Sequence, residues 1–326
     1  MKHFKYNLQL FAEPNTNVTT AAGLSDEMKV YYSDYLIDNA IPKLVHDQFG
    51  QKHPIPKNGG KTIEFRKYSP LPKLTSPIQE GITPDGQSLN MTTIEATVAQ
   101  YGGYITLSDV LMLTAIDNNL VQATKLLGSQ AGATLDTITR EVLNGGTNVI
   151  FSGDKSARAD LDASSLLTVD DIKKAVRLLK SQNAEKINGD WVGIINPDVA
   201  YDLTNDPAWK DVKTYDPDDI YEGEIGKLYG VRFVETTEAK VWANAGAGGR
   251  AVYSTLILGD NAYGTTEITG GGLEHIVKQL GSAGTSDPLN QRATAGWKAT
   301  KVAERLVENY MVRIESASTF NPTANN

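Results

Sequence analysis

The chain has 326 residues, with 31 basic and 39 acidic side chains and a formal net charge of −8, so no overall positive field exists to hold nucleic acid nonspecifically. Hydrophobic residues make up 40% and charged residues 21%, which is typical of a folded chain with a sizeable core. Cysteine is absent, which excludes disulfides, thiol nucleophiles and zinc–thiolate sites, and no stretch has the roughly 18 to 20 apolar residues of a membrane span.

The N-terminal residues predict a mobile arm followed by a helix. Polar residues interrupt the apolar residues of MKHFKYNLQLFAEP, so a signal peptide is not expected, and we interpret the segment as mature chain used in the cytoplasm. Residues 12–24 lack periodicity and are rich in Thr, Asn and Pro. From Ser25, which can cap a helix, apolar residues recur at helical spacing to about Pro42.

A two-stranded ribbon is predicted next. KTIEFRKY (61–68) and TIEATVAQYGGYITL (93–107) both alternate apolar and polar side chains. The residues between them contain too many helix and strand breakers for another regular element, namely Pro70, Pro72, Pro77, Gly81, Pro84 and Gly86. Because an isolated ribbon is only marginally stable in water, we expect something outside the ribbon to hold it.

The strongest helical pattern of the chain follows the ribbon. Apolar residues from Leu113 to Val142 recur at steps of three, four or seven, with Ser108 as a start cap and Gly145-Gly146 as a stop. We predict one helix of about thirty-five residues and about 50 Å. Gly128 and Gly132 predict a kink or a close backbone approach within it.

The second half of the chain predicts shorter elements. Thr168 and Asp171 frame a helix that runs to about Ser181. Residues 189–281 are interpreted as a small α+β unit, with strands at 191–195, 230–236, 253–259 and 273–280 and a short helix opened by Asn196-Pro197. After a polar loop at 282–292, alternation from Trp297 to Ile314 predicts one long strand that returns to the earlier domain.

No catalytic, cofactor or metal site is predicted. Gly60-Lys61-Thr62 matches only the end of a phosphate-binding loop, since Ile55 stands where a glycine is required and a strand pattern follows, so we interpret it as a turn. Gly270–Gly272 lacks the spacing of a dinucleotide-binding loop and is interpreted as a hinge or tight turn. The histidines lack metal-binding spacing, and we expect His46 near a helix end and His275 on a strand; the full set is His3, His46, His53 and His275.

Two clusters of charged residues have two possible interpretations each, a binding site or a solvated surface. The acidic cluster could offer oxygen ligands to a divalent cation, although it departs from the EF-hand pattern and a solvated face is favoured; it comprises Asp198, Asp202, Asp206, Asp211, Asp216, Asp218, Asp219, Glu222 and Glu224. The basic cluster on one predicted helix could contact DNA locally, although a solvated face is again favoured; it comprises Lys173, Lys174, Arg177 and Lys180.

The order of these elements is similar to that of tailed-bacteriophage major capsid proteins, of the branch common in phages of Gram-positive bacteria. The resemblance covers nearly the whole chain. It is carried by YNLQLFAE (6–13), EGITPDGQSL (80–89), YGGYITLSD (101–109), GEIGKLYGVRFVET (223–236) and GSAGTSDPLNQRATAGWKA (281–299).

The resemblance implies the α+β major capsid (Johnson) fold of that family. Its parts would be an N-terminal arm (1–24), an N-terminal helix and linker (25–59), an extension loop (60–104), a peripheral domain with a long spine helix (105–188), an axial domain (189–292), and a return strand of the peripheral domain with the C-terminal tail (293–326). The extension loop of such proteins lies over a neighbouring subunit.

The implied function is structural and not enzymatic, without a cofactor or a membrane partner. The chain would assemble with itself into pentamers and hexamers of an icosahedral head that encloses double-stranded DNA nonspecifically. Portal, scaffold or decoration proteins would be further partners, and the location would be the virion capsid, assembled in the host bacterial cytoplasm. Independently of the resemblance, the arm, the ribbon and the polar loop carry apolar residues that the chain's own core cannot easily cover, so contacts between copies are expected.

Two alternative functions stay open at this point. An encapsulin-like protein shell shares the fold. A cytoplasmic hydrolase or nucleotide-binding enzyme, using NGGKT (58–62) or the acidic cluster, is the less favoured alternative.

Overall fold

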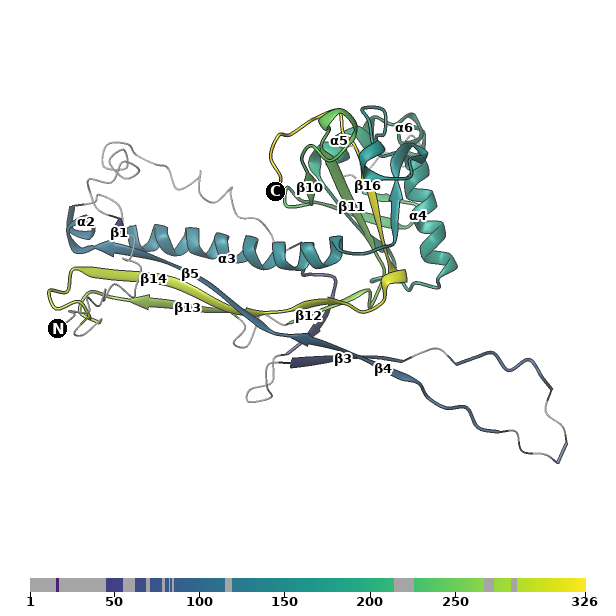
Figure 1. Cartoon of the computed structure of the whole chain (residues 1–326), viewed down its shortest axis with the longest axis horizontal. Helices are drawn as coiled ribbons and strands as arrows, with labels where there is room; N and C mark the ends of the chain where they lie inside the picture. The colour runs from purple at the N-terminus through teal and green to yellow at the C-terminus, as the bar shows by residue number, and fades with distance from the viewer. Residues whose placement is uncertain are drawn as a thin grey trace, which may run out of the picture. The chain divides into compact units, whose positions relative to one another are not determined.

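The structure is a computed structural model that describes residues 16–17, 45–54, 62–68, 71–77, 80–81, 83, 85–114, 119–213, 226–266, 273–282 and 286–326. The chain divides into two compact units (Figure 1). Unit 1 comprises Met1–Ile41, Gln100–Gly132 and Leu273–Ala299, and unit 2 comprises Pro42–Ala99, Ala133–Gly272 and Thr300–Asn326. The predicted N-terminal arm, apart from two residues, and the predicted helix from Ser25 lie outside the described residues.

Unit 2 is built on a seven-stranded sheet, here called the large sheet. Its strands follow the order β6 (Val149–Phe151), β16 (Met311–Ser316), β11 (Val252–Leu258), β7 (Trp191–Ile195), β9 (Val231–Glu235) and β8 (Lys227–Leu228), with β10 (Val241–Trp242) paired to β11. Every residue of the central strand β11 is buried. Because both faces of this central strand are covered, its sequence VYSTLIL does not need to alternate apolar with exposed polar residues.

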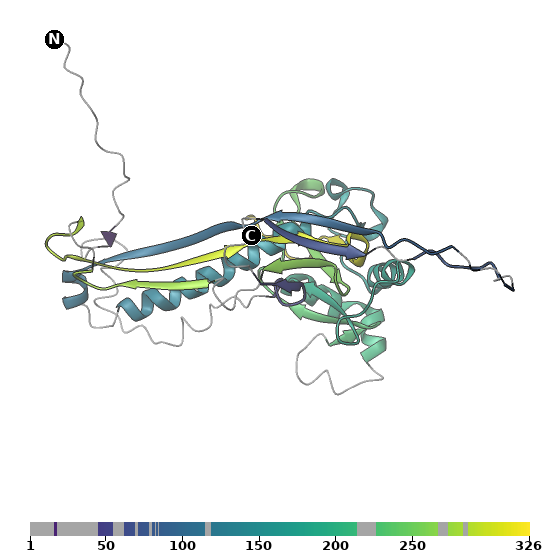
Figure 2. The same ribbon diagram turned by 90° about the horizontal axis from the view of Figure 1, so that it is seen from below.

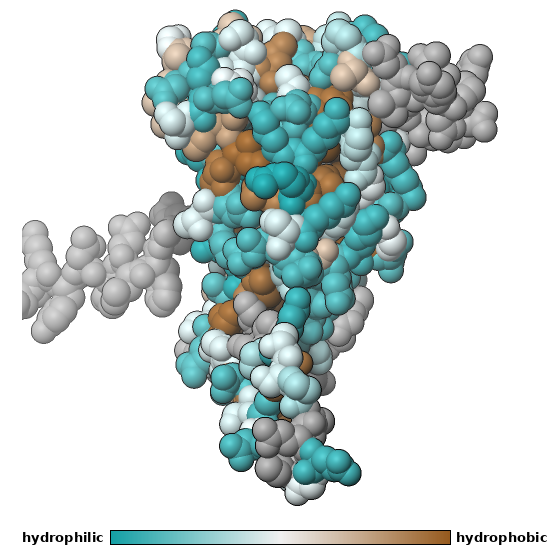
Figure 3. Space-filling view, turned by 90° about the vertical axis from the view of Figure 1, so that its right-hand side faces the viewer, coloured by the Kyte–Doolittle hydropathy of each residue, from teal (hydrophilic) through white to brown (hydrophobic). Residues whose placement is uncertain are grey.

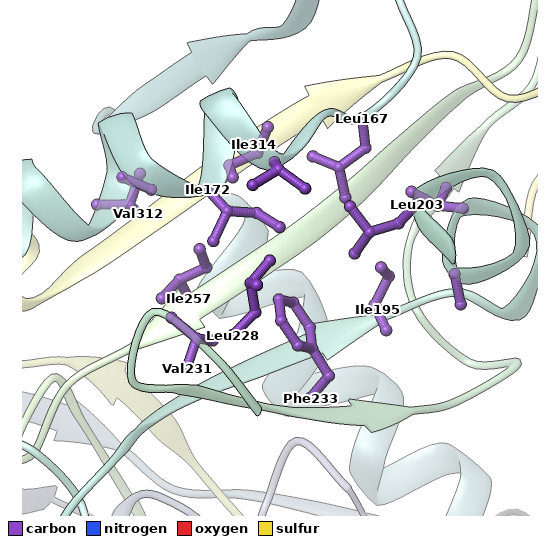
Figure 4. Close-up of a cluster of buried hydrophobic side chains, with 14 of the residues drawn as sticks. Leu167, Ile172, Ile195, Leu203, Leu228, Val231, Phe233, Ile257, Val312 and Ile314 are labelled. Atoms are coloured by element: carbon purple, nitrogen blue, oxygen red, sulfur yellow. The ribbon is translucent and has the colours of Figure 1, made fainter. Parts of the chain in front are cut away.

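Both faces of the large sheet carry a hydrophobic cluster. Alternate side chains point to opposite faces of a strand, so Ile257 of β11 belongs to one cluster and Leu256 to the other. The cluster of Ile257 contains residues of the helices α4 (Val169–Ser181), α5 (Pro197–Asn205) and α6 (Pro207–Lys213) (Figure 4). The other cluster includes Leu143 and Tyr263. Unit 2 therefore has a core of its own.

Helix α4 confirms the predicted start and end. Thr168 accepts a hydrogen bond from the backbone N–H of Asp171, whose carboxylate accepts one from the backbone N–H of Thr168. This capping box satisfies donors that the first turn leaves unpaired. The helix ends at Ser181, as its apolar spacing predicted, and buries Ile172 and Leu179 against the large sheet.

The ribbon, defined as residues 62–97, is confirmed as an antiparallel pair of β3 (Thr62–Tyr68) and β4 (Met91–Thr97). Phe65 lies opposite Ile94, and it is buried in a small cluster that includes Val302. A Cβ on Gly264 would lie 2.5 Å from the Phe65 ring, so the ring rests directly on that backbone. Only the base of the ribbon is thus held by its own unit, and the paired strands project from it (Figures 1 and 2).

Gly264 lies in a second, three-stranded sheet of unit 2. This sheet has the order β15 (Ala303–Arg305), β12 (Tyr263–Thr266) and β2 (Gln51–His53). Short 3₁₀ turns lie elsewhere in unit 2 at Ser152–Asp154, Arg158–Asp160, Ala247–Gly249 and Glu308–Tyr310.

Unit 1 contains a four-stranded sheet, here called the long sheet. Its order is β1 (Thr16–Asn17), β5 (Ala99–Ser108), β14 (Arg292–Lys301) and β13 (Leu273–Lys278). Helix α2 (Asp109–Thr114) follows β5, and helix α3 (Asn119–Asn144) runs from unit 1 into unit 2. Figures 1 and 2 show the first half of α3 beside the long sheet, where the Trp297 Nε1–H donates to Gln130 Oε1 at 3.2 Å.

The structure differs from two predictions about helices. The predicted single helix of about thirty-five residues is wrong at its start, since α2 ends at Thr114 and α3 begins at Asn119. Helix α3 then runs without interruption past Gly128 and Gly132 to the predicted stop. A Cβ on Gly128 would meet no atom within 4 Å, so the predicted close approach does not exist there.

Two predictions about strands are also corrected. The single return strand is wrong, because β14, β15 and β16 lie in three different sheets. The strand pattern at 273–280 does form β13, but β13 pairs with β14 in unit 1 instead of joining the 189–281 unit. Alternation of apolar and polar residues predicts that a segment forms a strand, but it does not predict which sheet the strand joins. Both corrections therefore concern the sheet to which a strand belongs.

Candidate assembly surfaces

The described acidic residues of the predicted acidic cluster stabilise the fold. Asp198 accepts a hydrogen bond from the Tyr253 hydroxyl at 2.7 Å. Asp202 accepts hydrogen bonds from Ser318 Oγ at 2.6 Å and from the Thr319 N–H at 2.9 Å. Among the described residues no three His, Asp or Glu side chains converge as a metal site requires. Residues 214–225, with the remaining acidic run, lie outside the described residues.

The described histidines are packed inside unit 2. His46 is fully buried; its Nδ1 lies 2.7 Å from Asp136 Oδ2, and its backbone N–H donates to Asp136 Oδ1 at 2.8 Å. His53 stacks edge-on against Phe65, with 4.9 Å between ring centroids. The side chain of His275 and all of His3 lie outside the described residues.

The described part of the glycine-rich candidates gives no support for a phosphate site. Thr62 begins strand β3, so the NGGKT segment leads into a strand and not into the helix that a phosphate-binding loop requires. Lys61 and Gly270–Gly272 lie outside the described residues.

Three members of the basic cluster are engaged by neighbouring side chains. Lys174 Nζ lies 2.8 Å from Asp154 and 3.1 Å from Asp170. The hydrogen bond from Lys174 lowers the pKa of the Asp154 carboxyl, as expected for an ion pair. Lys173 and Lys180 lie over the rings of Tyr229 and Trp191. The cluster therefore presents less free positive charge than its sequence suggests.

Large apolar side chains on the projecting part of the ribbon are left uncovered by the described residues. Leu74 is 79% exposed and Leu89 is 73% exposed, and Leu71 and Met91 are about half exposed. Figure 3 shows the side of the molecule from which the ribbon projects, with apolar residues interrupting a largely polar surface. Soluble monomers rarely leave such residues together in water, so they indicate a contact surface.

One face of the long sheet carries apolar side chains that the described residues leave exposed. Ile276 of β13 pairs with Gly296 of β14, and a Cβ on Gly296 would lie 2.9 Å from the Cβ of Tyr104 on β5. The absence of a side chain at Gly296 thus leaves room for Tyr104, which is 66% exposed. A cavity of about 410 Å³ adjoins Tyr104 and is lined also by Thr106, Lys278, Ser282, Ser286, Asp287, Arg292 and Thr294.

A third set of exposed apolar side chains lies on α2 and on the loop before β14, which contact each other. The Asp109 N–H donates to the Gln291 carbonyl at 3.0 Å, which brings the two segments together. Leu113 on α2 is 86% exposed and Leu289 in the loop is 75% exposed. Leu113 has the spacing of a buried residue in the predicted long helix, so the sequence did not predict its exposure. The predicted contact role of the 282–292 loop is consistent with this position.

Comparison with known proteins identifies the family. The sequence profile described as phage capsid protein matches residues 91–310, which is more than half of the chain. The chain belongs to the phage capsid protein family. This membership makes it a major capsid structural protein of the bacteriophage head, located in the virion capsid, and not an enzyme. A search of curated proteins finds no match.

Solved capsid structures confirm that the capsid protein has the predicted major capsid fold. The capsid of Ralstonia phage GP4 superposes with a TM-score of 0.67 at 14% identity, covering 94% of this chain and 100% of that one. The capsid of Cyanophage P-SCSP1u gives 0.61 at 15% identity, with 85% and 87% covered. The Cyanophage Pam1 capsid gives 0.60 at 16% identity, with 80% and 86% covered. None of the described helices of the capsid protein combines the length and apolar character needed to cross a membrane.

Proposed function

We propose that the capsid protein assembles with itself into pentamers and hexamers of an icosahedral head that encloses double-stranded DNA. The observation that carries this proposal is the row of exposed apolar side chains on the projecting ribbon, from Leu71 to Met91. Burying one such leucine contributes about 1.5 to 3 kcal/mol, so several of them per copy give a lattice contact of useful strength. The face of the long sheet around Tyr104 and the surface around Leu113 are the other expected contacts.

The domain assignment by resemblance forms part of the proposal. Residues 1–24 serve as the arm, 60–104 as the extension loop, 105–188 and 293–326 as the peripheral domain with its tail, and 189–292 as the axial domain. The projecting ribbon supports the extension-loop assignment. The membership of β13 in unit 1 favours moving residues 273–292 from the axial to the peripheral domain.

Packaged DNA is expected to touch the shell weakly and without sequence preference. The chain carries a net charge of −8, and the basic cluster on α4 is largely engaged by acidic and aromatic neighbours. Arg177 is the exposed member of that cluster for which the structure records no such neighbour among its described residues. The proposal also includes portal, scaffold or decoration proteins as further partners, assembly in the bacterial cytoplasm, and membership of the branch common in phages of Gram-positive bacteria.

Deleting residues 70–88 tests the proposed role of the ribbon. The core of unit 2 does not involve these residues, so the circular dichroism spectrum and the thermal unfolding of the body should be retained. Electron microscopy should show no shells from the deleted protein under conditions in which the full chain forms them. Normal shells from the deletion would overturn the proposal.

The contents of the particles distinguish the two kinds of shell. Particles isolated from infected cells should hold double-stranded DNA, measured by nuclease-protected absorbance at 260 nm. Particles that hold a cargo protein instead would favour an encapsulin-like shell.

A further inference from the structure

A buried lysine faces a buried aspartate in unit 2, and neither has a role in the assembly surfaces. Lys301, at the end of β14, is 1% exposed, and Asp47, in the segment before β2, is 4% exposed. Their positions are separated by 254 residues along the chain. Burying an ion pair removes both charges from water, and this desolvation costs several kcal/mol per ion.

Two threonine hydroxyls surround this pair. Lys301 Nζ contacts Asp47 Oδ1 and also the hydroxyl of Thr265. The Thr265 hydroxyl donates to Asp47 Oδ1 at 2.8 Å, and the Thr139 hydroxyl donates to the same oxygen at 3.2 Å. The amine therefore has a partner carboxyl within contact, and one hydroxyl bridges the two groups.

Burial also favours the uncharged form of the Lys301 side chain. Desolvation lowers the pKa of Lys301, although the neighbouring charge of Asp47 opposes this shift. Moving one proton from the ammonium to the carboxylate converts the ion pair into an amine beside a carboxylic acid. The amine is then a nucleophile held against its target, so the reaction does not need a diffusional encounter.

We propose that Lys301 and Asp47 form an amide bond within the chain. Nζ of the neutral lysine attacks Cγ of the protonated Asp47 carboxyl. The second proton leaves Nζ through the Thr265 hydroxyl, which passes its own proton to Oδ1, and Oδ1 departs with both protons as water. The ammonium and the carboxylate together thus yield one amide and one water, and no other reactant is required.

The bond would replace two buried charges with one neutral group and so remove their desolvation cost. It would also join the segment after the predicted N-terminal helix to the end of β14. A closed loop of this length restricts the unfolded chain, which is the principal way in which a cross-link raises stability. The proposal does not depend on self-assembly, since all four residues belong to unit 2 of one copy.

Intact-mass spectrometry of the full chain tests the proposal. The purified protein should weigh one water less than its sequence predicts. After trypsin, residues 44–52 (LVHDQFGQK) and residues 299–305 (ATKVAER) should appear as one branched peptide, because trypsin does not cleave after an acylated lysine. Fragmentation should place the branch between Asp47 and Lys301.

Matched variants separate the reaction from mere contact. Lys301→Met keeps the length of the side chain but removes the nucleophile, and its mass should equal the sequence mass. Thr265→Val keeps the shape but removes the bridging hydroxyl, and the dehydrated fraction should fall by at least tenfold at equal times after synthesis. The Lys240–Glu141 pair, 2.8 Å apart but with Glu141 47% exposed, is an internal control that should stay unlinked.

The wild-type mass decides the question even if a variant fails to fold. The full sequence mass with normal cleavage after Lys301, in both dispersed and assembled folded protein, would overturn the proposal and show an ion pair only. A dehydrated mass with its branch at another pair would also overturn it. A dehydrated branched peptide supports the proposal whether or not shells form, so its outcome is independent of the assembly function.

Discussion

The ribbon and the large sheet are both built of β-strands, but they differ in how much of their apolar surface is buried. The large sheet buries most of its apolar side chains, whereas the ribbon leaves many of its own exposed. In β11 of the large sheet every residue is buried, between clusters on its two faces. In the ribbon only the base around Phe65 is buried, and leucines farther out remain in water. The core of the large sheet is therefore built within one copy, whereas the outer part of the ribbon finds no cover among the residues that the structure describes. The following changes test this contrast, from the largest effect to the smallest.

Replacing Leu74 and Leu89 together with serine should damage assembly more than any other change described here. Each leucine contributes about 1.5 to 3 kcal/mol when it becomes buried. The protein concentration at which shells form, measured by light scattering, should rise by at least tenfold, while the unfolding midpoint of the dispersed protein stays unchanged. Thr75→Ser with Thr92→Ser, on the same ribbon, is the control and should assemble normally. Equal assembly of the two double variants would show that the ribbon leucines have no partner in the shell.

Ile257→Ala should have the opposite effect, with a loss of folding stability instead of a direct loss of a contact between copies. Ile257 is fully buried in the core of unit 2, so truncation should lower the free energy of unfolding by about 2 to 5 kcal/mol. Urea denaturation of the dispersed protein measures this change. A variant as stable as the wild type would mean that the large sheet is not the core described here.

Leu113→Ser tests the surface where α2 meets the 286–291 loop. A single leucine that becomes buried in the shell contributes about 1.5 to 3 kcal/mol, so assembly should weaken by about tenfold or more without loss of stability. Light scattering and thermal unfolding together give the result. A lowered melting temperature would instead place Leu113 inside the folded monomer.

Glu141 should produce the smallest effect, and only in acid. Burial alone raises the pKa of Glu141, but hydrogen bonds from Lys240 and Arg140 outweigh it and bring the pKa below its ordinary value of 4.5. The lowered pKa means that the ion pairs stabilise the fold above about pH 4.5 and that this contribution is lost as the pH falls through the folded pKa. Because Glu141 is half exposed, the contribution is about 1 kcal/mol or less. Glu141→Gln should therefore be less stable than the wild type at pH 7, and urea denaturation should show this difference shrinking as the pH falls below 4.5.

Local signals in the sequence predicted much of the fold. The capping residues Thr168 and Asp171 fixed one helix from start to end, and Asn196-Pro197 opened another as predicted. The ribbon was predicted from alternation and from the breakers between its strands. These features depend on residues close in sequence, where propensity and capping determine the structure.

Features that depend on distant residues were not predictable from one sequence. The apolar and polar residues of β13 alternate as in any strand, and only the pairing of β13 with β14 places it in unit 1. The exposed Leu113 has the spacing of a core residue. Lys301 and Asp47 meet only after folding, and neither has a neighbour in sequence that indicates the contact. The overall architecture was predicted from the resemblance to the family and not from the local sequence patterns.

The central claim is that the ribbon's apolar side chains are covered by other copies of the chain. Cryo-electron microscopy of assembled particles tests it most directly, by the position of Leu74 and Leu89 in the density. The account predicts closed shells in which both leucines are buried against a neighbouring subunit. Shells in which the ribbon lies against its own unit or stays in solvent would contradict it.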